Sequence, residues 1–305
     1  WSSDVCSSDL ENSCWMLIRL AQRHESLRTV FAAASETPEQ VILAEPLTDL
    51  RWVTADSNDQ HAGQRRSFAF AAVLQPFDLA AGPLWRLLVI ERGHDDYELY
   101  LVMHHIIADG WSVNVLLNEL AGIYAGLAQG NRTELPELPV RYVDYAIWQR
   151  NRIDAGELAP QRNYWVEQLG DDQSPMHLPL DHPRPVAPSG CGDVVRFALD
   201  PQASARFRQI MQTEGATAFM GLLTAFAALL YRYCGQSDVR VGVPVTNRNQ
   251  MAVTGIIGLF VNMLVIRSQV DGALNFHQLL AQIRATVLAA QDHAELPFDQ
   301  LVEAL

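Results

Sequence analysis

The chain has 305 residues, of which 49% are hydrophobic, and its formal net charge is −13. This length suffices for one large domain or for two lobes with cores of their own, and no uninterrupted apolar run is long enough to span a bilayer. The acidic balance argues against general nucleic-acid binding. The 4 cysteines lack metal-ligand spacing and fit reduced thiols in the cytosol better than a disulfide framework. The composition therefore predicts a globular cytoplasmic protein that binds neither nucleic acid nor a membrane.

The first residues, Trp1–Leu10, differ in character from the rest of the chain. They read WSSDVCSSDL, and the codons TGG AGT TCA GAC GTG TGC TCT TCC GAT CT, which encode them, resemble a common short-read sequencing adapter. The alternative is a polar, Ser-rich tail, and the segment is too polar for a signal peptide. We interpret residues 1–10 as an adapter-derived artefact and expect them to be exposed, outside any sheet and without a role in function.

The first half of the chain mixes helical and strand patterns. Apolar residues at helical spacing predict an amphipathic helix over Ser13–Ala34. Two short strands are predicted at EQVIL and LRWVT, and PLWRLLVIE and YELYLVMHH predict a hairpin joined by RGHDD. Further helices are predicted over Gly110–Gly126, over YVDYAIWQRN and over QRNYWVEQL. This order is typical of an α/β lobe, which we assign to residues 11–172.

A proline-rich segment separates this half from the next. SPMHLPLDHPRPVAPSGCG carries five prolines and no apolar periodicity, which indicates a crossover over residues 173–190. Beyond it, over residues 191–305, strand and helix patterns begin again, and a second α/β lobe is predicted. Its expected elements are a strand at DVVRFAL, helices over Gln202–Gln212 and Ala216–Tyr233, strands at DVRVGVPV and LFVNMLVIRS, and a helix over Phe276–Gln291.

The candidate chemistry lies in the stretch MHHIIADGWS, at the end of a predicted strand. Neighbouring strand residues point to opposite faces, so His104 and His105 are poorly placed to share a metal ion. A satisfied core histidine would explain only one of the two. His105 could instead hold or deprotonate a nucleophile near neutral pH, and backbone N–H groups at the turn, Gly110 first, could face a developing oxyanion. Acyl transfer without a covalent intermediate is one candidate among several.

The same stretch resembles the HHxxxDG signature of condensation domains from nonribosomal peptide synthetases. Wax-ester synthases and other acyltransferases of the chloramphenicol-acetyltransferase-like fold share that signature. Four more stretches resemble motifs of the condensation family and occur in the family's order. They are RHESLRTVF, YVDYAIWQR, IGLFVNMLVIR (with Met263 in place of the usual threonine) and QDHAELPFDQLVEAL.

The resemblance implies an α/β fold of two chloramphenicol-acetyltransferase-like lobes, which form a V with a tunnel between them. The family's opening SxAQxRLW motif and its RDxSRxPL region are not found in the sequence. On this comparison the chain is expected to be a domain truncated at both ends, with an incomplete C-terminal lobe.

The activity that the resemblance implies is amide formation between a donor acyl or peptidyl thioester and an acceptor aminoacyl thioester. Both substrates would be carried on the 4′-phosphopantetheine arms of upstream and downstream peptidyl carrier domains, beside an adenylation domain, and the domain itself would bind no cofactor. The intact histidines argue against a heterocyclisation domain, and DGWS looks most like the subtype that joins an L-donor to an L-acceptor. The alternatives are a recruiting domain without catalysis and an ester-forming acyltransferase, which would lack RHESLRT and YVDYAIWQR.

Carried over position by position, the resemblance gives His105 the central role. His105 would position the acceptor amine or take its proton, and the Gly110 N–H would be an oxyanion donor. His104 would be structural, more buried than His105 and turned away from the cleft. The expected lining of the tunnel is Trp111, Ser112 and Asn262.

Asp109 is expected to be a structural anion at the base of this turn. A carboxylate beside apolar strands needs a cation there. VPVTNRNQ supplies Arg248, and acyltransferases of this fold carry a similarly placed arginine, so Arg248 is our first choice of partner. Arg267 is the second choice and Arg28 the third. We expect the guanidinium to bind the carboxylate through two parallel hydrogen bonds.

Overall fold

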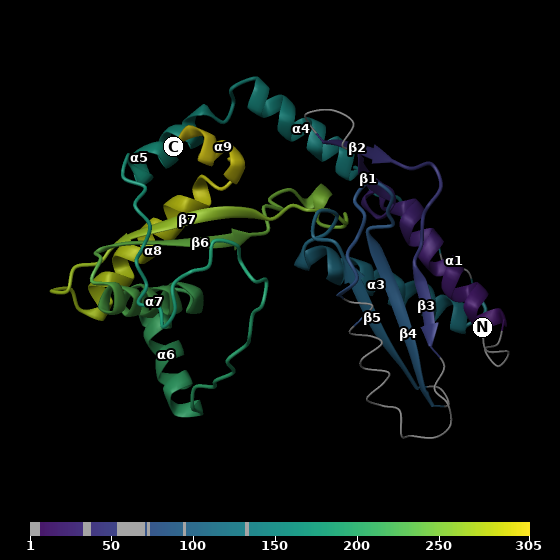
Figure 1. Cartoon of the computed structure of the whole chain (residues 1–305), viewed down its shortest axis with the longest axis horizontal. Coiled ribbons are helices and arrows are strands. Elements are labelled where there is room, and N and C mark those ends of the chain that lie inside the picture. Colours follow the sequence, from purple (N-terminus) through teal and green to yellow (C-terminus); the bar gives the residue numbers. More distant parts are fainter. Residues whose placement is uncertain (1–6, 33–37, 54–70, 72–73, 94–95, 132–133) are drawn as a thin grey trace. The chain divides into compact units, whose positions relative to one another are not determined.

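The computed structural model describes residues 7–32, 38–53, 71, 74–93, 96–131 and 134–305. Contacts between residues divide the chain into two compact units. The first unit comprises Trp1–Ala155 and Arg248–Val261, and the second comprises Gly156–Asn247 and Asn262–Leu305. Each unit mixes helices with strands (Figure 1), so the predicted α/β class is present in both.

The division into units departs from the expected lobe boundaries in two places. Helix α5 (Ala159–Leu169) belongs to the second unit, although it lies within residues 11–172. Conversely, Arg248–Val261 belongs to the first unit, although in sequence it joins two strands of the second. Residues 248–261, which we call the downstream segment, thus complete the first unit from far along the chain. This segment makes most of the contacts described below.

A three-stranded sheet with the order β3-β4-β5 organises the first unit. Strand β3 is parallel to β4, and β4 pairs with β5 in the predicted antiparallel hairpin, with Trp85 opposite Met103. A separate antiparallel pair joins β1 to β2. The elements are α1 (Ser7–Arg23), η1 (Glu25–Arg28), β1 (Thr29–Ala32), β2 (Glu39–Ile42), β3 (Leu50–Val53), β4 (Trp85–Gly93), β5 (Asp96–Met103), α3 (Gly110–Ala128), α4 (Tyr142–Asp154) and η3 (Met251–Val253), where η denotes a 3-10 helix.

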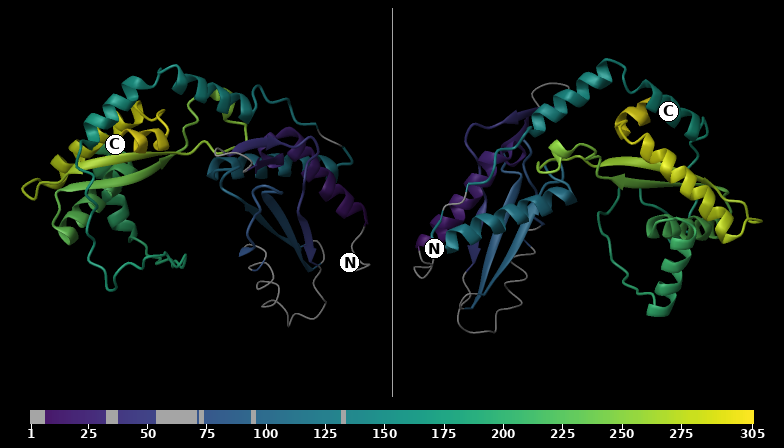
Figure 2. Two further views of the ribbon diagram at one scale, coloured as in Figure 1. Left: turned by 45° about the horizontal axis from the view of Figure 1, so that its top comes forward. Right: turned by 180° about the vertical axis from the view of Figure 1, so that it is seen from behind.

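The core of the first unit lies between this sheet and two helices. Strand β4 is the central strand, and its continuous apolar run is buried, as expected for a strand covered on both faces. Leu17 and Leu20 of α1 and Leu116 and Ile123 of α3 pack in one cluster with β4 side chains. Figure 2 shows α3 alongside β4 and β5. The loop from β5 to α3 is therefore held between two well-packed elements.

The predicted helix over Ser13–Ala34 is wrong in its C-terminal part. The helix begins at Ser7 and ends at Arg23, and η1 and β1 follow. His24 adopts an extended backbone conformation with φ −105 and ψ 106, which interrupts the helix. The β-branched stretch Thr29–Ala32 then finds a strand partner in β2, and such tertiary pairing overrides the helical periodicity of the sequence.

The second unit pairs β6 with β7 in an antiparallel hairpin and covers it with helices. Alternate side chains of β7, from Asn262 to Ser268, are buried, and α8 packs on this strand with its apolar face. The elements are α5 (Ala159–Leu169), α6 (Pro201–Thr213), α7 (Ala218–Cys234), β6 (Asp238–Val245), β7 (Asn262–Gln269), α8 (Phe276–Asp292) and α9 (Phe298–Ala304).

The strand predicted at DVVRFAL is not present. Residues 191–200 have no regular structure, and Val195 and Phe197 are each 86% exposed. Alternation of apolar residues gives a segment a preference for the extended state, but a strand also needs a partner for its backbone hydrogen bonds. The proline-rich segment before it is likewise irregular and exposed, as predicted.

The expectations for Trp1–Leu10 fall mostly outside the described residues. Only Ser7–Leu10 are described, as the start of α1, and nothing is described of their side chains. In the part of the chain that is described, no single helix passes a length and hydropathy test for a membrane span, and only α6 and α7 together, bent by 106°, do so.

Candidate active site

The candidate site is the loop of residues 104–109, which joins the end of β5 to the start of α3 and which we call the candidate turn. Strand β5 ends at Met103, so His104 and His105 lie beyond it, in a turn, and not on the strand as predicted. His105 is exposed, whereas His104 is partly buried, and this difference in burial agrees with the prediction. No described residue hydrogen-bonds to the His105 imidazole. An exposed imidazole at this position is accessible to a substrate.

His104 makes contacts that suit a structural role. Its Nδ1 accepts a hydrogen bond of 3.1 Å from the Ile106 N–H, and its own backbone N–H donates to the Leu84 carbonyl at 2.9 Å. The ring also lies edge-on to Phe77, with 6.1 Å between ring centroids. These contacts shape the turn and leave His104 engaged with its own chain.

Asp109 fixes the start of α3. It is the N-cap residue, in an extended conformation, and its side chain is only 1% exposed. Oδ1 accepts hydrogen bonds from the backbone N–H and the hydroxyl of Ser112, at 2.8 and 2.7 Å. Oδ2 accepts one from the Phe260 N–H at 3.2 Å. The carboxylate therefore binds a backbone N–H at the start of α3 that has no partner within the helix, and it also binds the downstream segment.

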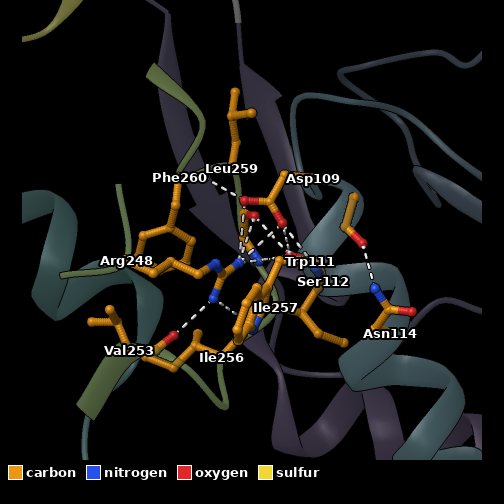
Figure 3. Close-up of polar contacts among 12 residues, drawn as sticks. Asp109, Trp111, Ser112, Asn114, Arg248, Val253, Ile256, Ile257, Leu259 and Phe260 are labelled. Atoms are coloured by element: carbon orange, nitrogen blue, oxygen red, sulfur yellow. Dashed lines mark hydrogen bonds and ion pairs between the residues drawn. The ribbon is translucent and has the colours of Figure 1, made fainter. Parts of the chain in front are cut away.

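The predicted contact between Asp109 and Arg248 is present. Nη2 of Arg248 lies 3.1 Å from Oδ1 and 3.3 Å from Oδ2, and both side chains are almost wholly buried (Figure 3). Nη1 donates to the Val253 and Ile256 carbonyls at 2.7 and 2.8 Å. The guanidinium carbon lies 3.9 Å from the centroid of the Phe260 ring, which adds a cation–π contact.

The geometry of this pair corrects one detail of the expectation. A single nitrogen, Nη2, is shared between both carboxylate oxygens, so the two parallel bonds from two nitrogens are not formed. Nη1 instead binds backbone carbonyls of the downstream segment. Of the other two candidate partners, Arg267 pairs with Asp238, and Arg28 lies near Glu25 and donates to the Leu43 carbonyl.

Ser112 and Tyr142 bind the backbone of the same downstream segment. The Ser112 hydroxyl accepts from the Gly258 N–H at 3.0 Å and lies 2.8 Å from the Gly258 carbonyl. Tyr142 donates to the Leu259 carbonyl at 2.9 Å, and burial raises its pKa to about 12, so the phenol stays protonated as a donor. A Cβ at position 258 would lie 2.2 Å from the Tyr142 ring, which explains why a glycine stands there.

Residues from four of the five sequence motifs thus meet around the candidate turn, and the residues that meet all belong to the first unit. MHHIIADGWS supplies Asp109 and Ser112, and IGLFVNMLVIR supplies the backbone that both bind. YVDYAIWQR supplies Tyr142, and RHESLRTVF supplies Ser26, whose hydroxyl donates to the Ile257 carbonyl at 2.7 Å. The sequence did not predict these contacts between motifs, because each joins residues that lie far apart in the chain.

Two of the three residues expected to line a tunnel are buried instead. Ser112 is 0% exposed and serves the network above. Asn262 is 7% exposed, and its amide is fully used, because it donates to the Ala294 and Leu296 carbonyls and accepts from the Phe298 N–H. Trp111 is 44% exposed and donates to the Thr254 carbonyl, so of the three only Trp111 presents a surface to a ligand.

The charges of the site have a consequence for stability in acid. Burial raises the pKa of Asp109, but the hydrogen bonds from Ser112, the charge of Arg248 and the Phe260 N–H outweigh it, so the net pKa is lowered. Burial also lowers the pKa of Arg248, but an arginine stays charged at neutral pH. In Glu119, the hydrogen bonds from His24 and Arg23 and the charge of Arg23 likewise outweigh burial and lower the pKa.

We therefore expect the free energy of unfolding to fall as the pH drops below about 4, the ordinary carboxyl pKa of an unfolded chain. A group whose pKa is lowered by folding contributes stability above its unfolded pKa and loses it as the pH falls through the folded value. Urea midpoints measured between neutral and acidic pH test this. Asp109→Asn should make the dependence shallower, and an identical pH dependence in the variant would contradict the assignment.

The chain is similar to parts of large peptide synthetases. It is 40% identical over 292 residues to a linear gramicidin synthase protein of Brevibacillus parabrevis, in a match that covers 94% of this chain and 4% of that protein. It is 38% identical over 287 residues to the phosphinothricin tripeptide synthetase PhsC of Streptomyces viridochromogenes, covering 93% of this chain and 26% of that protein. The chain thus spans a small part of the length of these relatives.

Solved structures of similar fold include the X-domain from teicoplanin biosynthesis. It is 27% identical with a TM-score of 0.88, and the match covers 97% of this chain and 66% of that one. The first condensation domain of the calcium-dependent antibiotic synthetase, in complex with a substrate analogue, is 21% identical with a TM-score of 0.77, covering 98% of this chain and 70% of that one. At this identity the second similarity shows the fold alone.

The family model of the condensation domain matches residues 4–305. The match includes residues 4–10, which the adapter interpretation sets aside, and that interpretation stays a prediction. The matched region also spans both compact units and all five motifs.

Proposed function

This chain belongs to the condensation-domain family, and we propose that it forms an amide bond between a carrier-bound acyl or peptidyl thioester and the amine of a carrier-bound aminoacyl thioester. The observation that carries the proposal is the contrast in burial within the candidate turn. The turn presents His105 to solvent, while Asp109 and Arg248, both buried, hold its far end. Such a division between an accessible acid–base group and a rigid support is what acyl transfer to an amine requires.

In this proposal His105 acts on the acceptor amine, either by positioning it or by accepting its proton. The amine nitrogen attacks the thioester carbonyl, the tetrahedral oxyanion collapses, and the donor carrier leaves as a thiol that takes up the proton. The nascent charge on the carbonyl oxygen needs a hydrogen-bond donor. Gly110 is the first residue of α3, where backbone N–H groups have no partner within the helix, so its N–H is available for this role.

Gly110 lies where the described part of the chain leaves room for a side chain. A Cβ added to Gly110 would meet no atom of the described residues within 4 Å, and the residue does not have the positive φ that favours glycine. Packing within the chain therefore does not explain the absence of a side chain. A Gly110→Ala variant therefore adds its methyl group without a clash with the described residues.

Gly110→Pro tests the oxyanion role directly. Proline is well tolerated at the first position of a helix, and Asp109 before it already has the extended conformation that a following proline needs. The substitution removes the N–H but keeps the fold, so we expect an unchanged melting temperature and a loss of about 10²–10³-fold in kcat. Gly110→Ala is the matched control, because it keeps the N–H and adds only the Cβ. Equal rates for Gly110→Pro and Gly110→Ala would contradict the donor role.

We further propose the partners that such a reaction needs. These are an upstream and a downstream peptidyl carrier domain, whose 4′-phosphopantetheine arms carry the substrates, and an adjacent adenylation domain. The similarity to multidomain synthetases supports this setting. No cofactor of the domain itself takes part in the scheme, and the proposed location is the cytoplasm. The DGWS sequence supports the subtype that joins an L-donor to an L-acceptor.

The deciding experiment is a transfer assay in the full-length domain. The two carriers are loaded with an L-aminoacyl donor and an L-aminoacyl acceptor, and dipeptidyl product on the acceptor carrier is followed by mass spectrometry. Product formation that requires the domain supports the proposal. Ester formation with a hydroxyl acceptor and no amide product would assign the domain to the ester-forming acyltransferases instead.

A second candidate is a recruiting domain without catalysis. It is favoured by the similarity to the X-domain from teicoplanin biosynthesis, which has also been solved in complex with OxyB and has the same TM-score of 0.88 in that complex. The intact pair of histidines favours catalysis. The same assay separates the two, because a recruiting domain would form no product with any pair of loaded carriers.

A further inference from the structure

The first unit contains a buried histidine that the proposed reaction does not use. His24 lies where α1 ends and η1 begins, and its side chain is 0% exposed. Its Nε2 lies 2.7 Å from Oε2 of Glu119 on α3, and Oε1 of the same carboxylate accepts from Nε of Arg23 at 3.0 Å. A buried imidazole held by a carboxylate has a defined orientation.

The hydrogen bonds of His24 define which nitrogen carries the proton. Its Nδ1 faces the backbone N–H of Ile257 at 3.4 Å, and because that group can only donate, Nδ1 must be the unprotonated acceptor. The proton therefore sits on Nε2 and is donated to Glu119. In this state the imidazole links α3 to the backbone of the downstream segment.

His24 binds Ile257, which lies in the middle of the backbone stretch that holds the candidate turn in place. Ile257 is 0% exposed, and its carbonyl accepts from the Ser26 hydroxyl, so both of its backbone polar groups are bound by the residues around η1. On one side of it, the Ile256 carbonyl accepts from Arg248. On the other, the backbone of residues 258–260 binds Ser112 and Asp109.

We propose that His24, oriented by Glu119, is a positioning residue for the candidate active site. It sets the register of residues 256–260, and these residues in turn place Arg248 and Asp109 and hence the turn that carries His105 and Gly110. The catalytic part of this inference rests on the proposed amide-forming function, while the structural part does not.

Two substitutions separate the two hydrogen bonds of the imidazole. The carbonyl oxygen of an asparagine occupies about the place of Nδ1, so His24→Asn keeps an acceptor for the Ile257 N–H and loses the reach to Glu119. The amide of a glutamine reaches about as far as Nε2, so His24→Gln keeps the contact with Glu119 and loses the acceptor. The two variants are matched controls for one another.

We expect His24→Gln to lower kcat by up to about 10²-fold with little change in the KM for either carrier, because a displaced active-site group affects the transition state more than docking. His24→Asn should keep a kcat near the wild-type value. A kcat near wild type in both variants, or an equal loss in both, would overturn the proposal.

Amide hydrogen exchange in the full-length domain gives a readout without catalysis. The amides of Ile257 and Gly258 should exchange faster in His24→Gln than in the wild type, and His24→Asn should resemble the wild type. Unchanged exchange in His24→Gln would overturn the structural part. If the wild type forms no amide but the exchange rates change as described, the proposed function fails while the positioning of residues 256–260 by His24 stands.

Discussion

His105→Ala is expected to abolish peptide transfer while the protein keeps its melting temperature. The side chain is exposed in the turn after β5, and no described residue binds its imidazole, so its removal leaves no buried group unsatisfied. Loss of one proton-transfer or positioning group typically costs about 10²–10⁴-fold in rate. Transfer between loaded carriers, measured beside thermal unfolding of the same preparation, checks both halves of the expectation.

His104→Ala is the informative neighbour for this experiment. His104 accepts the Ile106 N–H and packs against Phe77, so its loss should lower the melting temperature. The two adjacent histidines are thus expected to give opposite patterns, one in rate and the other in stability. A wild-type transfer rate in His105→Ala would favour the recruiting-domain alternative.

Asp109→Ala is expected to damage stability and activity together. The Asp109 and Arg248 side chains are 1% and 2% exposed, and removal of the carboxylate leaves the guanidinium buried without its counter-charge. Breaking one partner of such a pair typically costs about 3–5 kcal/mol. The substitution also removes the acceptor for the N–H groups of Ser112 and Phe260. Denaturant unfolding should show the loss, and the transfer assay should show a lower rate.

Two controls show whether this loss comes from the buried pair. In Asp109→Ala combined with Arg248→Met, no unpaired charge remains, so the double variant should lose less stability than the sum of the single variants. The ion pair of Arg19 with Glu134 is solvent-exposed, at 41% and 83%, and Glu134→Gln should leave stability unchanged. Additive losses in the double variant would mean that Asp109 and Arg248 do not stabilise one another.

Local patterns were sufficient to predict most of the elements. Alternation and apolar runs predicted the β4–β5 hairpin, and helical spacing predicted α3 from Gly110 onward. These predictions are confirmed because the periodicity of side chains along a strand or a helix depends on neighbouring residues alone. The errors occur where a distant partner decides, as in β1, which pairs with β2 instead of continuing a helix, and in DVVRFAL, which is exposed and irregular.

The sequence by itself determined the family, through five motifs in order, and the charge of Asp109 and its need for a cation, which led to Arg248. Only the tertiary structure decided how that need is met. One nitrogen of Arg248 is shared by both carboxylate oxygens, Ser112 is buried beside them, and His24 and Glu119 hold Ile257 from residues far away in the chain. A sequence states which groups must be paired, because burial of a lone charge is costly wherever it occurs. It does not state which of several donors lies within 3 Å, because hydrogen bonds depend on distance and angle, and packing of the whole unit sets both.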